Sequence, residues 1–263
     1  MVRRRLHRRL PKGGSREKNR GLNRADAGGS SVQPWTEECG HDIRGAPLAE
    51  KPGIAKILVD IDIGIGIGTE MALNGTVSHA FAHILYKALL FMSMGAVLFR
   101  TGTIKGSELG GLYKSMPWTT GFCIVGAASI SAFPLFSGFI SKSMILTAAA
   151  EEGHWITWLA LLFASAGVFH HSGIKIPFFA FFAHDSGIRC KEAPMNMLLA
   201  MGAAAFLSVA IGVYPQPLYD ILPFPVDYAP YTVPHVVNML QLLLWSALAF
   251  VFLRRTGLYP PEL

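Results

Sequence analysis

Three ionisable side chains stand at four-residue intervals in one long apolar segment of the chain. The segment covers residues 76–99, TVSHAFAHILYKALLFMSMGAVLF, and carries His79, His83 and Lys87. At about 100° per residue, an α-helix would spread these side chains over only ~80° of its surface and ~12 Å of its length. Histidine titrates near neutral pH, and a lysine at the centre of a bilayer costs roughly 2.5–3.5 kcal/mol. A proton path through a membrane requires such a row of titratable groups.

Two other interpretations of this row are open. In the first, each polar side chain bonds a neighbouring helix and moves no proton. In the second, His79 and His83 chelate zinc. Metalloproteases of the HExxH type place a glutamate beside the first histidine, and Ala80 stands there in this chain. We therefore predict no metal ligands and favour the proton path.

A second candidate position is Lys142, in the segment AFPLFSGFISKSMIL. Pro134 and Gly138 precede it and predict a break in a helix. Lys142 then either faces a cavity at the break or reaches the membrane surface with its ammonium group. In the first case it is the next step of the relay, with Ser137, Ser141 and water as bridges.

A third polar cluster, His170, His171 and Lys175, lies inside another apolar segment. Helical spacing places His171 and Lys175 on one face, and Gly173 and Pro177 predict a kink that frees backbone carbonyl groups. The cluster is a candidate for a secondary proton relay or a cation path. The alternative is polar bonding between helices.

The composition is that of a membrane protein. Hydrophobic residues make up 51% of the 263-residue chain and charged residues 15%, against about 25% in soluble proteins. Residues 1–52 hold twelve Lys or Arg and six Asp or Glu, and basic and acidic residues are equal in number after them. The net charge of +6 therefore does not indicate that the main part of the protein binds nucleic acid.

Cofactor motifs are absent from the sequence. Its three cysteines form no CxxC pair, and neither a GxGxxG nor a GxxxxGK[ST] motif occurs. We expect no metal, no redox centre, no nucleotide cofactor and no catalytic residues, and we expect a transporter rather than an enzyme.

Hydropathy predicts an all-α membrane protein with about five to six transmembrane helices, one of them discontinuous. The clear spans are residues 76–99, 117–149, 155–182, 194–213 and 236–253, and the second is broken near Pro134 and Gly138. Residues 54–71 alternate as a strand does, but their glycines suit close helix packing, and we interpret them as the remnant of a helix.

The chain divides at about residue 52. Residues 1–52 are rich in Arg, Gly and Ser and predict a disordered basic leader unrelated to the fold, and residues 53–263 predict the transmembrane domain. Basic residues follow the first, third and fifth spans, and acidic residues follow the second and fourth spans. The positive-inside rule then places the C-terminus in the cytoplasm of a multi-pass protein of a bacterial-type inner membrane.

Two of these segments, HAFAHILYKALLFMSMGAVLFRTG and AFPLFSGFISKSMI, resemble the antiporter-like proton-translocating membrane subunits. That family includes the large membrane-arm subunits of respiratory complex I and the A and D subunits of Mrp-type Na⁺/H⁺ antiporters. A third segment, HHSGIKIPFFAFFAHDSG, is more similar to the Mrp D branch. The resemblance covers about residues 63–263.

The resemblance implies a bundle built from two inverted repeats, each with a discontinuous helix. It implies that His79, His83 and Lys87 belong to a central hydrophilic axis, with Lys142 at the outlet end of a half-channel. The first repeat has no counterpart here, so the chain is similar to the C-terminal part of such a protein, in a truncated copy.

We therefore expect a membrane subunit of a multisubunit Na⁺/H⁺ antiporter, with H⁺ and Na⁺ as transported ions and other membrane subunits and lipid as partners. One alternative is a proton-pumping subunit of a complex I-like NADH:quinone oxidoreductase, which would share the same polar groups but differ in its driving reaction. A second alternative is a non-conducting structural fragment.

Overall fold

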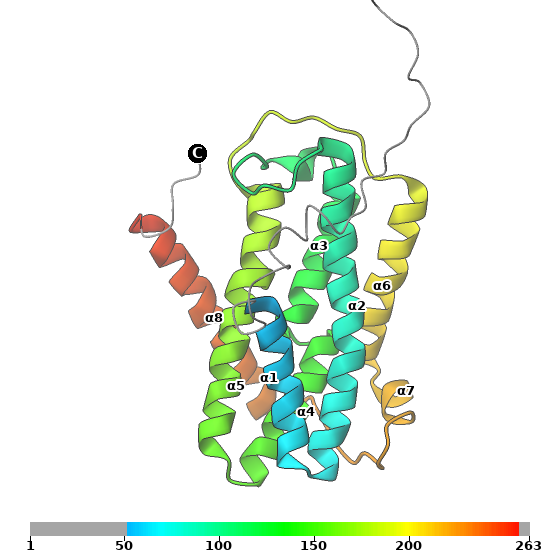
Figure 1. Cartoon of the computed structure of the whole chain (residues 1–263), viewed down its shortest axis with the longest axis vertical. Coiled ribbons are helices and arrows are strands. Elements are labelled where there is room, and N and C mark those ends of the chain that lie inside the picture. The colour runs from blue at the N-terminus through cyan, green and yellow to red at the C-terminus, as the bar shows by residue number, and fades with distance from the viewer. Residues whose placement is uncertain (1–51, 258–263) are drawn as a thin grey trace, which may run out of the picture. The chain divides into compact units, whose positions relative to one another are not determined.

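The computed structural model describes residues 52–257, with side chains from residue 60 onward. The predicted leader, residues 1–52, lies almost wholly outside the described residues. Every regular element within the described part is helical (Figure 1), which confirms the all-α prediction. The elements are α1 (Pro52–Ile67), α2 (Glu70–Thr101), η2 (Leu112–Lys114), α3 (Pro117–Ile130), α4 (Ser137–Glu151), α5 (Trp155–Val168), η3 (Phe169–Lys175), η4 (Phe178–Phe182), α6 (Met195–Val213), α7 (Gln216–Tyr219) and α8 (Val233–Arg255).

The predicted spans correspond closely to these helices. In the described part, four helices are long and apolar enough to cross a membrane: Glu70–Thr101, Trp155–Phe182, Met195–Val213 and Val233–Arg255. The predicted second span, residues 117–149, is the broken pair α3 and α4. Residues 54–71 contain α1 rather than a strand, as the glycine pattern indicated.

Helix α2 is longer at both ends than hydropathy predicted, because its ends are set by polar caps. The Thr69 hydroxyl accepts a hydrogen bond from the Ala72 amide, which satisfies one free N–H of the first turn. At the other end Gly102 adopts a left-handed conformation with φ of 76°, and its amide bonds the Leu98 carbonyl. Neither capping residue is apolar, so a hydropathy window places the helix ends too far inward.

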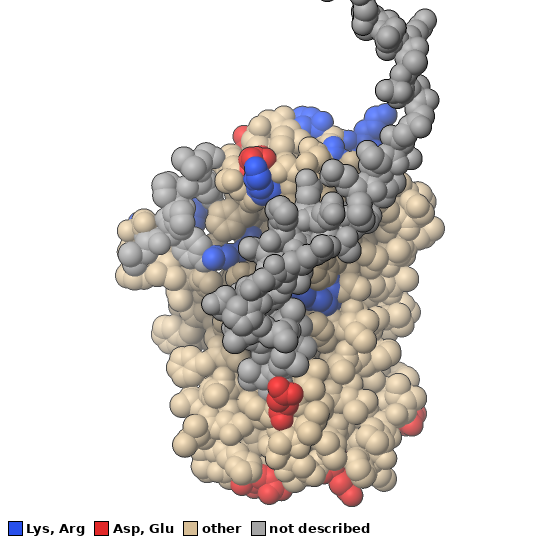
Figure 2. Space-filling view, in the orientation of Figure 1, with Lys and Arg blue, Asp and Glu red and all other residues tan. Residues whose placement is uncertain are grey.

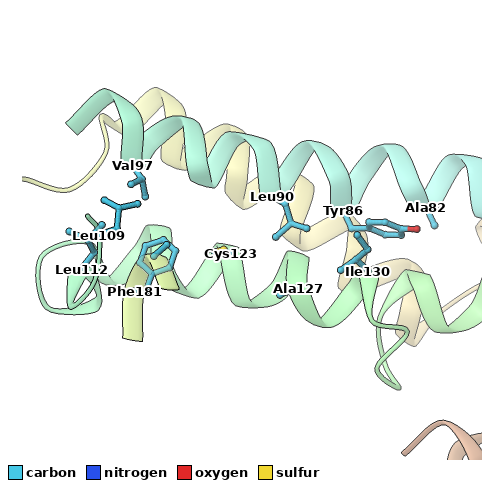
Figure 3. Packing of buried hydrophobic residues seen from close by; sticks show 11 residues of the cluster. Ala82, Tyr86, Leu90, Val97, Leu109, Leu112, Cys123, Ala127, Ile130 and Phe181 are labelled. Atoms are coloured by element: carbon cyan, nitrogen blue, oxygen red, sulfur yellow. The ribbon is translucent and has the colours of Figure 1, made fainter. Parts of the chain in front are cut away.

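A buried apolar seam joins α2 to α3, and the segment after α2 closes one end of it (Figure 3). Residues of α2 at helical spacing face residues of α3, and small side chains on both helices allow close approach. The seam contains Ala82, Tyr86, Leu90 and Val97 of α2, Cys123, Ala127 and Ile130 of α3, and Leu109, Leu112, Ala180 and Phe181. It places one face of α2 beside the end of α3.

The break between α3 and α4 is a tight, left-handed turn. Ala132 and Leu135 have φ of 56° and 76°, which non-glycine residues adopt uncommonly. Gly138 lies so close to the Ser129 carbonyl oxygen that a Cβ atom would overlap it. On α6, Gly212 is packed in the same way against the backbone of Leu135 and Phe136. The break is therefore held by backbone contact with a neighbouring helix.

The long third span changes helix type near its middle. Helix α5 continues into two π-helical segments, η3 and η4, with Pro177 between them. Proline lacks the N–H of a helical hydrogen bond and its ring disturbs the preceding turn, and π-segments in α-helices often mark functional sites. The kink predicted from Gly173 and Pro177 thus takes the form of π-helix.

Basic and acidic side chains gather at opposite ends of the helices (Figure 2). In the face shown, the lower end carries only acidic groups, and basic groups dominate the upper end. The α4–α5 turn lies at the lower end and the connection between α2 and α3 at the upper end (Figure 1). This segregation agrees with the alternation of charge along the sequence.

At the basic end, an ion cluster joins the α2–α3 connection to the segment that follows η4. The Asp185 carboxylate accepts hydrogen bonds from Arg189 at 2.8 and 2.9 Å, from Lys114 at 2.8 Å and from the Gly187 amide at 3.1 Å. Donation from Arg189 and Lys114 holds the pKa of Asp185 well below its usual range. The α2–α3 connection is thereby tied to the segment that follows η4.

Helix α3 begins where a distant carboxylate caps it. Pro117 occupies the first turn, where its missing N–H costs nothing. Glu192 accepts hydrogen bonds from the Trp118 amide at 2.9 Å and the Thr119 hydroxyl at 2.7 Å. A negative charge at a helix N-terminus is stabilising, so Glu192 helps to position the first half of the broken helix.

Candidate functional site

The first histidine of the predicted row, His79, lies in a chain of hydrogen-bonding groups from three helices. The residue is 1% exposed. Its Nε2 atom lies 3.4 Å from Asp60 Oδ2 on α1, and its Nδ1 atom lies 3.1 Å from the Ser141 hydroxyl on α4. Asp60 is 8% exposed. Both nitrogens of a buried imidazole therefore have an oxygen neighbour.

This arrangement can exist in two protonation states. With Asp60 ionised, the carboxylate only accepts, and the proton of the neutral His79 ring is then on Nε2, facing Asp60. In the neutral ring Nδ1 is then an acceptor for the Ser141 hydroxyl. The same hydroxyl lies 3.4 Å from the Gly138 carbonyl oxygen. If His79 takes a second proton, Ser141 can turn its own proton to that carbonyl and accept from Nδ1.

His83 stands one turn further along α2 and is half-buried. Its ring centroid lies 6.1 Å from that of His79 and 5.2 Å from that of Tyr86, which it meets edge to face. Tyr86 is 1% exposed and also lies 6.4 Å from the His79 ring. The two histidines are too far apart for a direct hydrogen bond, so proton transfer between them requires a bridging water.

Lys142 is buried at the break rather than extended to the membrane surface. The residue is 4% exposed, and its ammonium group donates to the Ile130 carbonyl oxygen at 3.1 Å. Ile130 ends α3, where free carbonyl groups and the helix dipole favour a positive charge. Lys142 follows Ser141 directly in α4, so the break brings it beside the hydrogen-bonding groups around His79.

Lys87, the third member of the predicted row, is half-buried. Its ammonium nitrogen lies 5.7 Å from the centroid of the Phe91 ring, within cation–π range. Of the predicted row, the structure thus buries His79 most deeply and places Lys87 nearer to the surface of the described bundle.

The secondary cluster lies in η3. His170 is half-buried, and the centroid of its ring lies 5.6 Å from that of the Phe250 ring on α8. His171 is exposed. Lys175 is half-buried at the end of the same segment. Gly173, between them, packs so closely on Ser131 that a Cβ atom would overlap its hydroxyl. The π-helix therefore contacts the break that also buries Lys142.

Sequence reasoning missed two members of the site. By hydropathy, Asp60 only makes residues 54–71 a poor membrane span. An acidic residue within an apolar run is nevertheless itself a sign of a functional site. Its neighbour Asp62 is exposed, and only Asp60 faces inward. Tyr86 follows His79 by seven residues and His83 by three, so helical spacing places all three on one face. Among the described residues, no group of three or more His, Cys, Asp or Glu gathers as metal ligands.

Comparison with known proteins identifies the family. Residues 61–211 match the family model described as NADH:quinone oxidoreductase/Mrp antiporter, TM. The chain is 31% identical over 162 residues to the D subunit of the Na(+)/H(+) antiporter of Alkalihalophilus pseudofirmus, a match that covers 60% of this chain and 32% of that protein. It is 30% identical over 151 residues to NADH-ubiquinone oxidoreductase chain 5 of Phytophthora infestans, covering 54% of this chain and 22% of that protein.

Two solved structures have a similar fold. An archaeal membrane-bound sulfane sulfur reductase superposes with a TM-score of 0.60 at 25% identity, covering 73% of this chain and 34% of that one. The Mrp complex from Dietzia sp. DQ12-45-1b superposes with a TM-score of 0.55 at 20% identity, covering 63% and 38%.

The chain thus spans about a third or less of the length of these two curated relatives. The matched region begins at residue 61 and contains the buried histidine, the broken helix and the lysine at the break. This multi-pass membrane protein belongs to the NADH:quinone oxidoreductase/Mrp antiporter transmembrane family.

Proposed function

We propose that the chain is part of a membrane subunit of a multisubunit Na⁺/H⁺ antiporter of the Mrp D type, in which it carries a proton path. The observation that supports this most is the buried sequence of groups Asp60, His79, Ser141 and Lys142, drawn from α1, α2 and α4. Similarity to the D subunit of a Na(+)/H(+) antiporter supports the same assignment.

The path has two parts with different roles. Asp60 and Ser141 hold the His79 ring and give each nitrogen a partner, so the ring can gain and lose a proton without reorienting. Lys142 follows the break in the chain, and its ammonium group lies at the C-terminal end of α3, which precedes the break. His83 extends the path along α2, and Lys87 continues it toward the outer face of the bundle.

The proposed partners and setting follow from this role. The protein works with other membrane subunits of a hetero-oligomeric assembly, in contact with lipid, and exchanges H⁺ for Na⁺. The basic end of the helices faces the cytoplasm of a bacterial-type cell, with the C-terminus on that side, because positive residues concentrate in cytoplasmic loops. His170, His171 and Lys175 form a secondary relay or cation path beside the break.

The test is ion-driven proton flux in membrane vesicles from cells that contain the complete assembly. Lys142→Ala and Lys87→Ala should each abolish Na⁺-dependent proton flux. Lys105→Ala is the matched control, because Lys105 is exposed and pairs only locally with Glu108 at 3.1 Å. Wild-type flux in the Lys142 variant would refute the proposed path.

A second candidate is a proton-pumping component of a redox-driven, complex I-like assembly. The similarity to chain 5 of an NADH-ubiquinone oxidoreductase and the likeness to a respiratory membrane complex favour it. The same vesicles distinguish the two. An antiporter moves protons when a Na⁺ gradient is applied without reductant, whereas a redox-driven pump requires a reductant and a quinone.

A further inference from the structure

A cavity opens at the acidic end of the bundle, and its lining contains none of Asp60, His79, Ser141 and Lys142. It lies between α4, α5 and the first turns of α8 and has a volume of about 250 Å³. Ligand pockets generally measure about 300–1,000 Å³, so this cavity suits a small group or the end of a longer molecule. Glu151 and Trp155 line it and are both exposed, so the cavity can be reached from outside.

One side of the cavity is a polar triangle. The Thr147 hydroxyl lies 3.2 Å from the Tyr228 hydroxyl and 3.3 Å from His235 Nε2. The Tyr228 hydroxyl lies 3.4 Å from His235 Nδ1. Thr147 and His235 both line the cavity. The three groups satisfy one another and give this wall fixed oxygen atoms that can accept a hydrogen bond.

The mouth of the cavity favours a positive charge. Ser143, Thr147 and Glu151 follow one another at four-residue intervals on α4 and all line it, so Glu151 stands at the end of a polar stripe. No Lys or Arg occurs among the described residues of the lining. The adjacent Glu152 is exposed and does not line the cavity.

Aromatic and apolar groups form the remaining walls. The indoles of Trp155 and Trp158 lie edge to face, with centroids 6.3 Å apart. Indole is the side chain with the strongest affinity for a cation over its face. Leu162 and Met239 lie among the apolar residues deeper in the lining. An acid, two indoles and an apolar wall are complementary to one chemical class, an ammonium group on an apolar chain.

We propose that this cavity binds an organic ammonium ion with an apolar substituent. Its nitrogen lies between the Glu151 carboxylate and the indoles of Trp155 and Trp158, and its chain lies against Leu162 and Met239. The site is separate from the proposed proton path, and its occupancy does not depend on ion transport. The ammonium can come from a free amine or from a lipid headgroup.

The test is calorimetric titration of the purified full chain, in an uncharged maltoside detergent, with hexyltrimethylammonium. We expect saturable binding at one site per chain. Glu151→Gln should weaken it about tenfold, the equivalent of losing ~1.4 kcal/mol of charge pairing. Glu152→Gln is the matched control and should leave the affinity unchanged, because it differs only in lying outside the lining.

A second variant tests whether Glu151→Gln weakens binding only indirectly. Trp158→Leu keeps an apolar wall but removes an indole, and should weaken binding by about two- to fivefold. Hexyl sulfate has the same chain with a negative headgroup and should not bind. Equal affinity in Glu151→Gln and Glu152→Gln, or equal binding of hexyl sulfate, would overturn the proposal.

Nanodiscs distinguish the two sources of the ammonium group. If hexyltrimethylammonium binds in phosphatidylglycerol discs but not in phosphatidylethanolamine discs, the lipid headgroup competes for the cavity and is the natural occupant. If it binds equally in both, the occupant is a free amine. Failure to bind in either disc, with wild-type protein that remains folded, contradicts the proposal.

Discussion

Glycine at position 212 should be required for the break in the α3–α4 helix. A Cβ atom there would overlap the carbonyl carbon and oxygen of Leu135 and reach the Cα atom of Phe136. These are backbone atoms of a turn whose Leu135 already has φ of 76°, so they cannot move aside as a side chain would. The Tyr231 hydroxyl also donates to the Gly212 carbonyl oxygen, which fixes α6 at this level.

The magnitude follows from two opposing effects. Gly→Ala inside a helix stabilises by up to about 1 kcal/mol through backbone entropy. Overpacking costs roughly 1–3 kcal/mol, and backbone overlap belongs at the upper end of that range. Gly212→Ala should therefore destabilise the protein by roughly 2 kcal/mol.

Gly202→Ala on the same helix is the matched control. A Cβ atom there would lie 3.5 Å from the Phe122 ring, an ordinary contact. This variant should gain the helix-propensity contribution without the overlap and be stabilised by up to about 1 kcal/mol. Unfolding in mixed maltoside and dodecyl sulfate micelles, followed by far-UV circular dichroism, measures both. Equal changes in the two variants would refute the close packing of α6 on the break.

Two further predictions concern contacts outside the proposed path. Asp185→Asn should lower the melting temperature at pH 7, because Arg189 and Lys114 depress the pKa of Asp185 in the folded protein. The contribution of Asp185 is fully present above the ordinary carboxyl pKa near 4 and is lost as the pH falls from there through the depressed pKa. The difference from wild type should therefore vanish in strong acid. Asn74→Ala should cost about 1–3 kcal/mol in the same unfolding assay. The Asn74 side-chain amide exchanges two hydrogen bonds, of 3.0 and 3.2 Å, with the backbone of half-buried Phe224, and the variant removes both. An unchanged unfolding midpoint would contradict that contact.

Hydropathy and spacing were sufficient to predict much of this fold. Long apolar runs predict spans because a bilayer requires about 20 apolar residues, and Pro134 predicted the break that separates α3 from α4. The helical period also placed His79 and His83 on one face of α2, where their rings lie 6.1 Å apart. These features are local, so a single segment contains enough information to predict them.

The contacts between segments could not be predicted in the same way. Asp60 reaches His79 only because the chain reverses at Gly68 and Thr69, which brings α1 back along α2. Whether Lys142 faces inward depends on the turn at the break, which spacing alone does not define. The cavity near Glu151 combines three helices and had no signature in any one of them.

The most direct test of the proton path compares two neighbouring aspartates of α1. Asp60 is buried against His79, and Asp62, two residues away, is exposed. In vesicles that contain the complete assembly, Asp60→Asn should reduce Na⁺-dependent proton flux at least tenfold, because the amide cannot stabilise a charged His79 ring as a carboxylate does. Asp62→Asn should retain wild-type flux. Equal flux in the two variants would contradict a path through Asp60 and His79.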